Sequence, residues 1–136
     1  MKLYRYYCDK VDEINTELNY NNYDFPSEGI FSRLERIARA NPDKYTFPIR
    51  YISRKLCDGV PFPMDDRVLY NMKVGIPMLE CFTELTNDKY QSEIKSIGNY
   101  LLNIHGMGLK CNIIDIDETT NLILYRDEYQ VILGLQ

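Results

Sequence analysis

The spacing of hydrophobic residues changes along the chain and predicts a mixture of strands and helices. Hydrophobic and aromatic residues from Lys2 to Cys8 follow the period of two that is typical of a β-strand. Asp9 then caps a predicted short helix that ends near Asn19. The apolar stripe of that helix consists of Val11, Ile14 and Leu18.

The next apolar stripe has helical spacing. A helix is predicted to begin at Pro26-Ser27 and to end at Asn41-Pro42-Asp43. The segment after it is ambiguous, because Tyr45 to Ile52 fits an edge strand, whereas Pro48 fits the first turn of a helix ending at Gly59. We favour the helix, since proline is tolerated in a first helical turn and removes a hydrogen bond from a strand. The first of these helices has an apolar face of Ile30, Leu34, Ile37 and Ala38, flanked by Arg33, Arg36 and Arg39.

Three further helical patterns occupy the middle of the chain. A short one runs through Val68, Leu69 and Met72, and after the breakers Gly75 and Pro77 a second runs through Met78, Leu79, Phe82 and Leu85. The clearest helix begins at a cap on Asn87 or Asp88 and ends at Gly106 and Gly108. Its apolar residues recur at steps of four and three: Tyr90, Ile94, Ile97, Leu101 and Ile104.

Beyond Lys110 the pattern changes to short apolar runs separated by polar turns. These runs predict three strands, Cys111 to Asp117, Asn121 to Arg126 and Tyr129 to Leu133, and turns this short favour an antiparallel meander. The N-terminal strand is expected to join them, because a lone strand leaves its backbone groups unpaired. The predicted fold class is therefore α+β: a small antiparallel sheet, made of the N-terminal strand and the C-terminal three-stranded meander, with four to five helices packed mainly on one face.

Composition agrees with one globular domain over residues 1–136. Of the 136 residues, 45% are hydrophobic and 26% are charged, which lies outside the composition of disordered chains. No apolar run approaches the roughly 20 residues of a membrane span. The first residues contain no apolar run typical of a secretory signal before Asp9, so we expect a cytoplasmic protein without membrane contact.

Residues that carry chemistry are few and dispersed. The four cysteines are at least 23 residues apart and form no zinc or redox motif, so we expect them to be small buried hydrophobes. The seven glycines form no phosphate-binding loop, and we expect no cofactor or metal. The single histidine, His105, has a structural explanation at a helix C-terminus. A small enzyme centred on His105 or on Asp115 and Asp117 is kept as an alternative.

The distribution of charge is more informative than the net charge of −4. Between Arg33 and Lys55, seven basic residues outnumber Glu35 and Asp43 by five, so the other residues together carry −9. This pattern predicts two candidate partner-binding surfaces. The basic patch consists of Arg33, Arg36, Arg39, Arg50, Arg54 and Lys55, together with Lys44. The acidic ridge consists of Asp115, Asp117, Glu118, Asp127 and Glu128, flanked by Tyr125 and Tyr129.

These features favour a non-enzymatic inhibitor or regulator that binds another protein through complementary charge. Twelve tyrosines and no tryptophan fit such a surface, because tyrosine is common at interfaces. The general profile resembles the immunity proteins and phage-encoded inhibitors, and the expected partner is a protein such as a nuclease or nucleic-acid enzyme. A nucleic-acid-binding regulator that uses the basic patch is the alternative, although the isoelectric point of about 5.0 argues against it. A homodimer formed through tyrosines or a sheet edge is also open.

Overall fold

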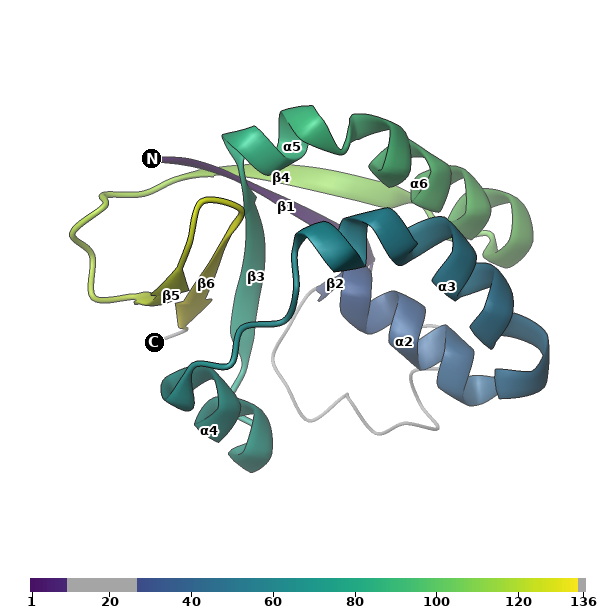
Figure 1. Ribbon diagram of the computed structural model, residues 1–136, viewed down its shortest axis with the longest axis horizontal. Coiled ribbons are helices and arrows are strands. Elements are labelled where there is room, and N and C mark those ends of the chain that lie inside the picture. The colour runs from purple at the N-terminus through teal and green to yellow at the C-terminus, as the bar shows by residue number, and fades with distance from the viewer. Residues whose placement is uncertain (10–26, 135–136) are drawn as a thin grey trace.

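The computed structural model describes residues 1–9 and 27–134, and these residues form an α+β structure, as predicted (Figure 1). The helix expected between Asp9 and Asn19 lies outside the described residues. Within the described ranges, no helix has the length and apolar composition needed to cross a membrane. The elements in chain order are β1 (Lys2–Asp9), β2 (Ser27–Gly29), α2 (Ile30–Ala40), α3 (Pro42–Gly59), α4 (Asp66–Val74), β3 (Met78–Thr83), α5 (Glu84–Lys89), α6 (Gln91–His105), β4 (Leu109–Asp115), β5 (Ile123–Arg126) and β6 (Gln130–Gly134).

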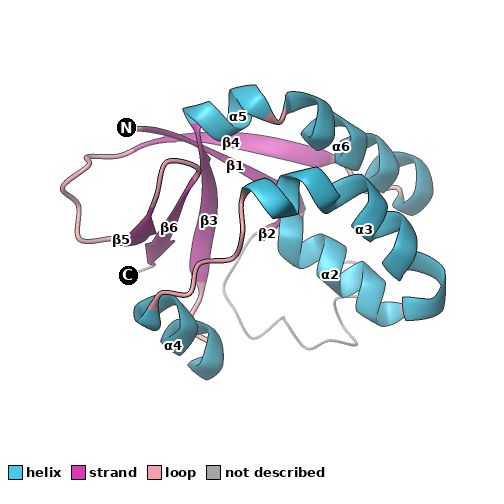
Figure 2. Cartoon of the chain, in the orientation of Figure 1, coloured by secondary structure: helices cyan, strands magenta, loops and turns pink. Residues whose placement is uncertain are grey.

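The strands form one antiparallel sheet centred on β1 (Figure 2). Strand β4 pairs with one edge of β1 from Lys2 to Cys8. The opposite edge is shared, because β3 pairs at Leu3 and Tyr4, whereas β2 pairs from Tyr7 onward. Strands β6 and β5 then follow β3. In Figure 1, β1 and β4 run across the view while β3, β5 and β6 run down it, so the sheet is strongly twisted.

The three C-terminal strands form, but they do not make the predicted meander. Strand β4 pairs with β1 rather than with β5, and only β5 and β6 form a hairpin. The N-terminal strand does join this sheet, as expected. Alternation of apolar and polar residues determines which face of a sheet a residue occupies, but it does not determine the neighbouring strand. Here β1 offers β4 seven consecutive partners, more than β5 has residues.

The helical pattern predicted through Met78 and Leu85 is wrong, because this segment is β3 followed by the short helix α5. Adjacent residues Cys81 and Phe82 are both buried, on opposite faces of the sheet. A strand that is buried on both faces reads as a continuous apolar run, without an alternation that distinguishes it from a helix. Strand β3, which lies between β1 and β6 in the sheet, was therefore hidden in the sequence.

The other helices form where the sequence predicts helices, but their first residues differ from the predicted ones. Helix α3 is a helix rather than an edge strand, but it begins at Pro42 and contains Pro48 in its interior. Helix α2 begins at Ile30, because the preceding residues form β2. Helix α4 is capped by the Asp65 side chain, which accepts the backbone N–H groups of two residues in its first turn.

Helix α6 confirms the clearest helical pattern of the sequence. It begins at Gln91, because α5 occupies the segment containing the predicted cap residues. It ends at Gly106, whose φ of 65° lies in the left-handed region that favours glycine. Its buried stripe includes Ile94, Ile97 and Leu101, whereas Ile104 is exposed.

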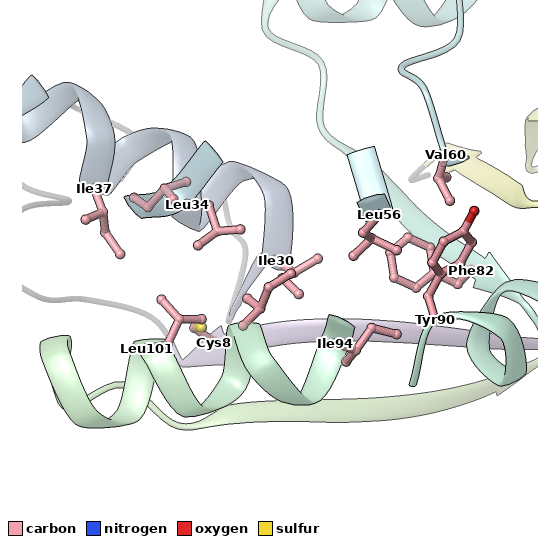
Figure 3. Packing of buried hydrophobic residues seen from close by; sticks show 12 residues of the cluster. Cys8, Ile30, Leu34, Ile37, Leu56, Val60, Phe82, Tyr90, Ile94 and Leu101 are labelled. Carbon is pink, nitrogen blue, oxygen red and sulfur yellow. The ribbon is translucent and has the colours of Figure 1, made fainter. Parts of the chain in front are cut away.

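Two apolar clusters lie on opposite faces of the sheet. The larger cluster joins α2, α3 and α6 to the sheet through Cys8 of β1 and Phe82 of β3 (Figure 3). The smaller cluster is centred on Leu3 and Cys81 and includes Val131 and Leu133 of β6. The helices thus cover one face of β1, as predicted, while residues from other strands pack around Leu3 on the other face.

Two identical substitutions on α6 test this assignment of the core. Replacing Ile97, which is fully buried, with alanine leaves a cavity and is expected to lower the free energy of unfolding by about 2–5 kcal/mol. Ile104→Ala is the matched control, because Ile104 is 57% exposed, and its effect should stay within about 0.5 kcal/mol. Urea denaturation measures both, and equal effects would contradict the orientation of α6.

Candidate functional site

The C-terminal part of the predicted basic patch lies on the exposed side of α3. We define the α3 face as the exposed residues Lys44, Phe47, Arg50, Tyr51, Arg54 and Lys55. The opposite side of the helix is anchored in the core by Ile49 and Leu56. An α-helix places residues four positions apart next to each other, so Phe47 adjoins Tyr51, and Arg50 adjoins Arg54. The sequence prediction of a basic surface included Arg50, Arg54 and Lys55, but it did not include the two aromatic residues.

Phe47 and Tyr51 are the most unusual residues of the α3 face. Their side chains are 79% and 77% exposed, and their ring centroids lie 6.5 Å apart with an angle of 22° between the ring planes. Exposure of two large adjacent rings leaves apolar area in water that a partner can cover. Aromatic residues are enriched in the buried centres of protein interfaces.

Arg50 and Arg54 place positive charge beside this aromatic pair. The Arg54 Nε atom lies 3.9 Å from the Asp58 Oδ2 atom, and both side chains are largely exposed, so solvent weakens this ion pair. Arginine recognises carboxylates through paired hydrogen bonds and also contacts aromatic rings. The α3 face therefore combines the two residue types that contribute most often to binding at protein interfaces.

The predicted extension of the basic patch onto α2 is wrong for two of its residues. Arg33 and Arg36 are only 1% and 5% exposed, so their side chains cannot belong to a solvent-facing ridge. Arg39 is exposed, and its guanidinium group pairs with Glu35 one turn earlier. The prediction assumed that arginine points to water, but a long aliphatic stem allows arginine to lie inside a protein when its charged end is accommodated.

The acidic ridge is divided between two turns rather than concentrated on one strand face. Asp127 lies in the β5–β6 turn, where its Oδ1 atom accepts the backbone N–H groups of Tyr129 at 2.7 Å and Gln130 at 2.9 Å. The Tyr125 hydroxyl donates to the Oδ2 atom of the same carboxylate at 2.7 Å. These bonds hold the turn together. The neighbouring Glu128 is exposed.

The other members of the ridge lie near the β4–β5 connection, on the left in Figure 1. The N-terminal amino group lies 3.3 Å from the Asp115 Oδ1 atom. Asp117 accepts hydrogen bonds from the backbone N–H and the hydroxyl of Thr119, and these bonds lower the pKa of Asp117. Most carboxylates of the ridge thus have partners within the chain, and Glu118 is exposed.

His105 connects α6 to α3 through aromatic contacts. Its Nε2 atom lies 3.1 Å from the Tyr100 hydroxyl oxygen, and its ring centroid lies 4.7 Å from that of Tyr45. This packing gives His105 a structural explanation, as the sequence indicated. Among the residues that the structure describes, no three histidine, cysteine, aspartate or glutamate residues are grouped so that they could hold a metal ion.

The expectation of four buried cysteines is correct for only two of them. Cys8 and Cys81 are buried, whereas Cys57 and Cys111 are exposed, and none of these four described cysteines forms a disulfide bond. Cys111 lies opposite Tyr6 in the β1–β4 ladder. Burial and the nearby Cys111 thiol raise the pKa of Tyr6 to about 12, and the Tyr6 hydroxyl donates to the side-chain oxygen of Asn87. The spacing of hydrophobic residues could not identify the two exposed cysteines. Both lie within a helix or a strand, α3 and β4, where buried cysteines are equally compatible with the sequence.

The half-buried residue Glu80 had no sequence signal. Glu80 lies in β3, near the point where the edge of β1 stops pairing with β3 and begins to pair with β2. It lines a cavity of about 10 Å³ together with Tyr4, Tyr6 and Phe82. Burial raises the pKa of Glu80 to about 7, and the positive charge of Arg5 opposes this effect. The cavity has room for about one water molecule, so it offers no site for a substrate.

Comparison of the chain with family models, curated proteins and solved structures finds no match. The candidate site is therefore chosen from the arrangement of side chains in the structure. Among the described residues, the α3 face combines a stacked pair of exposed rings with exposed arginines, and we take it as the candidate functional site.

Replacing Glu80 with glutamine tests the raised pKa of this carboxyl group. Its pKa is about 7 in the folded chain and 4.5 in the unfolded chain, so the folded state holds the proton more tightly. The contribution of this group to the free energy of unfolding is therefore greatest below about pH 4.5 and is lost as the pH rises through 7. Relative to the natural chain, Glu80→Gln should gain at most about 3 kcal/mol between pH 5 and pH 8.

Urea denaturation at several pH values measures this difference. Glu118→Gln is the control, because it removes one carboxylate from an exposed position. A stability difference between Glu80→Gln and the natural chain that is the same at pH 5 and pH 8 would show that the pKa of Glu80 is not raised by folding.

Proposed function

We propose that this chain is a non-enzymatic protein-binding inhibitor or regulator whose α3 face covers an acidic surface of another protein. The observation that carries the proposal is the stacked, exposed pair Phe47 and Tyr51, with Arg50 and Arg54 beside it. A partner that covers the rings removes apolar area from water, and its carboxylates pair with the arginines. Such a contact inhibits any activity of the partner that needs the covered surface.

Charge favours a protein over a nucleic acid as the partner. Helix α3 carries four basic residues, but it also carries Asp43 and Asp58, and the whole chain has a net charge of −4. Binding of nucleic acid draws most of its affinity from phosphates, which an acidic chain repels. A protein surface offers acidic side chains at the few positions that the arginines reach, together with apolar area for the rings.

The acidic ridge supports a partner less well than the α3 face does. To cover a basic groove, such as that of a nuclease, the carboxylates of the acidic ridge must break the contacts that they make within this chain. The Asp127 carboxylate holds a turn, and Asp115 pairs with the amino terminus. The exposed free thiols of Cys57 and Cys111 fit a reducing compartment, so the proposal includes action in the cytoplasm.

Charge reversal on the α3 face tests the proposal. The double variant Arg50→Glu with Arg54→Glu should keep the stability of the natural chain but bind the partner at least about tenfold more weakly, because two attractive contacts become repulsive. The control is Lys73→Glu with Arg126→Glu, which changes the net charge equally at exposed positions on α4 and β5. Each chain is immobilised, proteins captured from a native lysate are quantified, and the affinity of the purified partner is measured by calorimetry.

The proposal predicts one protein that the natural chain and the control capture and that the α3 variant loses. Its affinity should fall as salt is raised, because the contact is partly electrostatic. Capture that is equal for all three chains, or no captured protein, would contradict the proposal. A mobility shift of DNA or RNA that the α3 variant abolishes would overturn it in favour of a nucleic-acid partner.

A further inference from the structure

The side chains of the α3 face form three rows along the helix. An α-helix turns by about 100° per residue, so Phe47 and Tyr51 lie about 40° apart around its axis. The same geometry places Arg50 and Arg54 on one side of the two rings and Lys55 on the other side. All five side chains are exposed. The rings therefore form a central apolar row with positive charge on both sides of it.

The central row lies on the side of α3 that is opposite the core. Leu56 follows Phe47 by about two and a half helical turns, so the two side chains point in opposite directions. Leu56 is fully buried, whereas Phe47 is largely exposed. Helix α3 packs against α2 and α6 through its buried side (Figure 1). A partner that approaches from outside therefore meets the rings first and the basic residues on either side of them.

Two of these basic residues are available to pair with a partner, one on each side of the rings. Within the part of the chain that the structure describes, the side chains of Arg50 and Lys55 take part in no hydrogen bond or ion pair. Arg54 lies near Asp58, and the Lys44 Nζ atom lies 5.3 Å from the ring centroid of the following tyrosine. Arg50 and Lys55 therefore define the charge that an occupant has to match.

Acidic residues limit the length of the basic rows. Asp43 precedes Lys44 at the start of α3, and Asp58 follows Lys55 near its end. The helical geometry places Asp58 in line with the two rings, so it closes the apolar row at that end. The basic rows extend from Lys44 to Lys55, which is about 16 Å along the axis. A complementary occupant needs apolar side chains and carboxylates over about three helical turns.

A helix presents side chains in the arrangement that these rows require. An extended strand directs every second side chain to a surface, so it offers α3 a single row. A helix packed along α3 offers an apolar row at its centre and a further row on each side. Paired helices in coiled coils use this arrangement, in which charged residues on both sides of the apolar seam select the partner.

We propose that the α3 face binds one amphipathic helix of another protein, with an apolar seam and acidic residues on both sides of that seam. The seam covers Phe47 and Tyr51. Carboxylates on one side of the seam pair with Arg50, and carboxylates on the other side pair with Lys55. The inference rests on the proposed function, because it names the element through which the partner protein contacts the α3 face.

A second copy of the chain fits the α3 face less well. Contact between two α3 faces brings the basic rows of one copy against the basic rows of the other, so like charges oppose the contact. Such a dimer also leaves Arg50 and Lys55 without the carboxylates that an acidic helix offers to both. An acidic amphipathic helix satisfies the apolar row and both charged rows together.

The probes for the test are two fluorescein-labelled, end-blocked peptides, each as long as α3, which has 18 residues. Both carry a leucine seam and the same number of glutamates, and the same hydrocarbon link away from the seam holds both helical. The two-sided peptide has glutamates on both sides of the seam, whereas the one-sided peptide has all of them on one side. The two-sided peptide should bind the natural chain at least about tenfold more tightly, because only it pairs with both basic rows. Fluorescence anisotropy measures each affinity.

Variants of the chain provide the reciprocal test. Tyr51→Ala should weaken binding of the two-sided peptide at least about tenfold, whereas Tyr70→Ala, at a residue of α4 that is 60% exposed, should leave it unchanged. Lys55→Gln should remove most of the preference for the two-sided over the one-sided peptide, because one basic row then loses its charge. Lys73→Gln on α4 is the charge control and should keep that preference. The replaced side chains are all exposed, so each variant is expected to fold.

Three outcomes would overturn the inference. The first is no binding of the two-sided peptide at concentrations up to the millimolar range. The second is equal binding of the two peptides, which would indicate attraction by net charge alone. The third is binding of the chain to vesicles containing phosphatidylserine, or to a single-stranded oligonucleotide, in place of the peptide and with loss of that binding in Tyr51→Ala.

The result also separates this inference from the proposed function. A protein that the natural chain captures and that the reversal of Arg50 and Arg54 loses, together with equal binding of the two peptides, would support the α3 face as a binding surface and remove the helix as its occupant. Absence of any captured protein would contradict the proposed function itself, whichever peptide binds.

Discussion

The antiparallel ladder between β1 and β4 is the constraint on which the rest of the structure depends. It joins residues 2–8 to residues 109–115, which are far apart in the sequence, and occupies one edge of β1. Strands β2 and β3 must therefore share the opposite edge, and Glu80 lies where one succeeds the other. The ladder also fixes the faces of β1, because Cys8 joins the helical cluster while Leu3 joins the smaller cluster. Two apolar faces and two occupied edges make β1 the centre of the molecule.

The α3 face and the outer edge of β4 follow from this arrangement in different ways. Helix α3 is 18 residues long but buries only a narrow stripe, so Phe47 and Tyr51 remain on its outer side. Recognition there depends on side chains, since the helix backbone is internally bonded. Strand β4 instead has an outer edge with which no strand pairs among residues 1–9 and 27–134.

Sequence patterns predicted the helices and strands whose apolar residues are regularly spaced within the element itself. The stripe of Ile94, Ile97 and Leu101 identified α6, and alternation identified β1, because each pattern depends on one element packing against one core. Strand β3 was missed because it is buried on both faces. The partner of β4 was missed because strand pairing is not local, and periodicity contains no information about it.

Candidate site residues were harder to predict than elements. Arg33 and Arg36 are identical in type to Arg50 and Arg54, yet the first pair is buried and the second is exposed. Only the packing of α2 against its neighbours separates them. Phe47 and Tyr51 were not predicted as surface residues, since large rings are usually buried. Their helical spacing was visible in the sequence, but which side of α3 faces the core was not.

Amide hydrogen exchange, measured residue by residue on β4, tests the central arrangement most directly. The account predicts alternating protection: the N–H groups of Lys110, Asn112 and Ile114 bond to β1 and exchange slowly, whereas those of Cys111 and Ile113 face solvent and exchange quickly. Uniform protection along the strand would show that its outer edge is covered. Uniformly fast exchange would show that the ladder with β1 does not form.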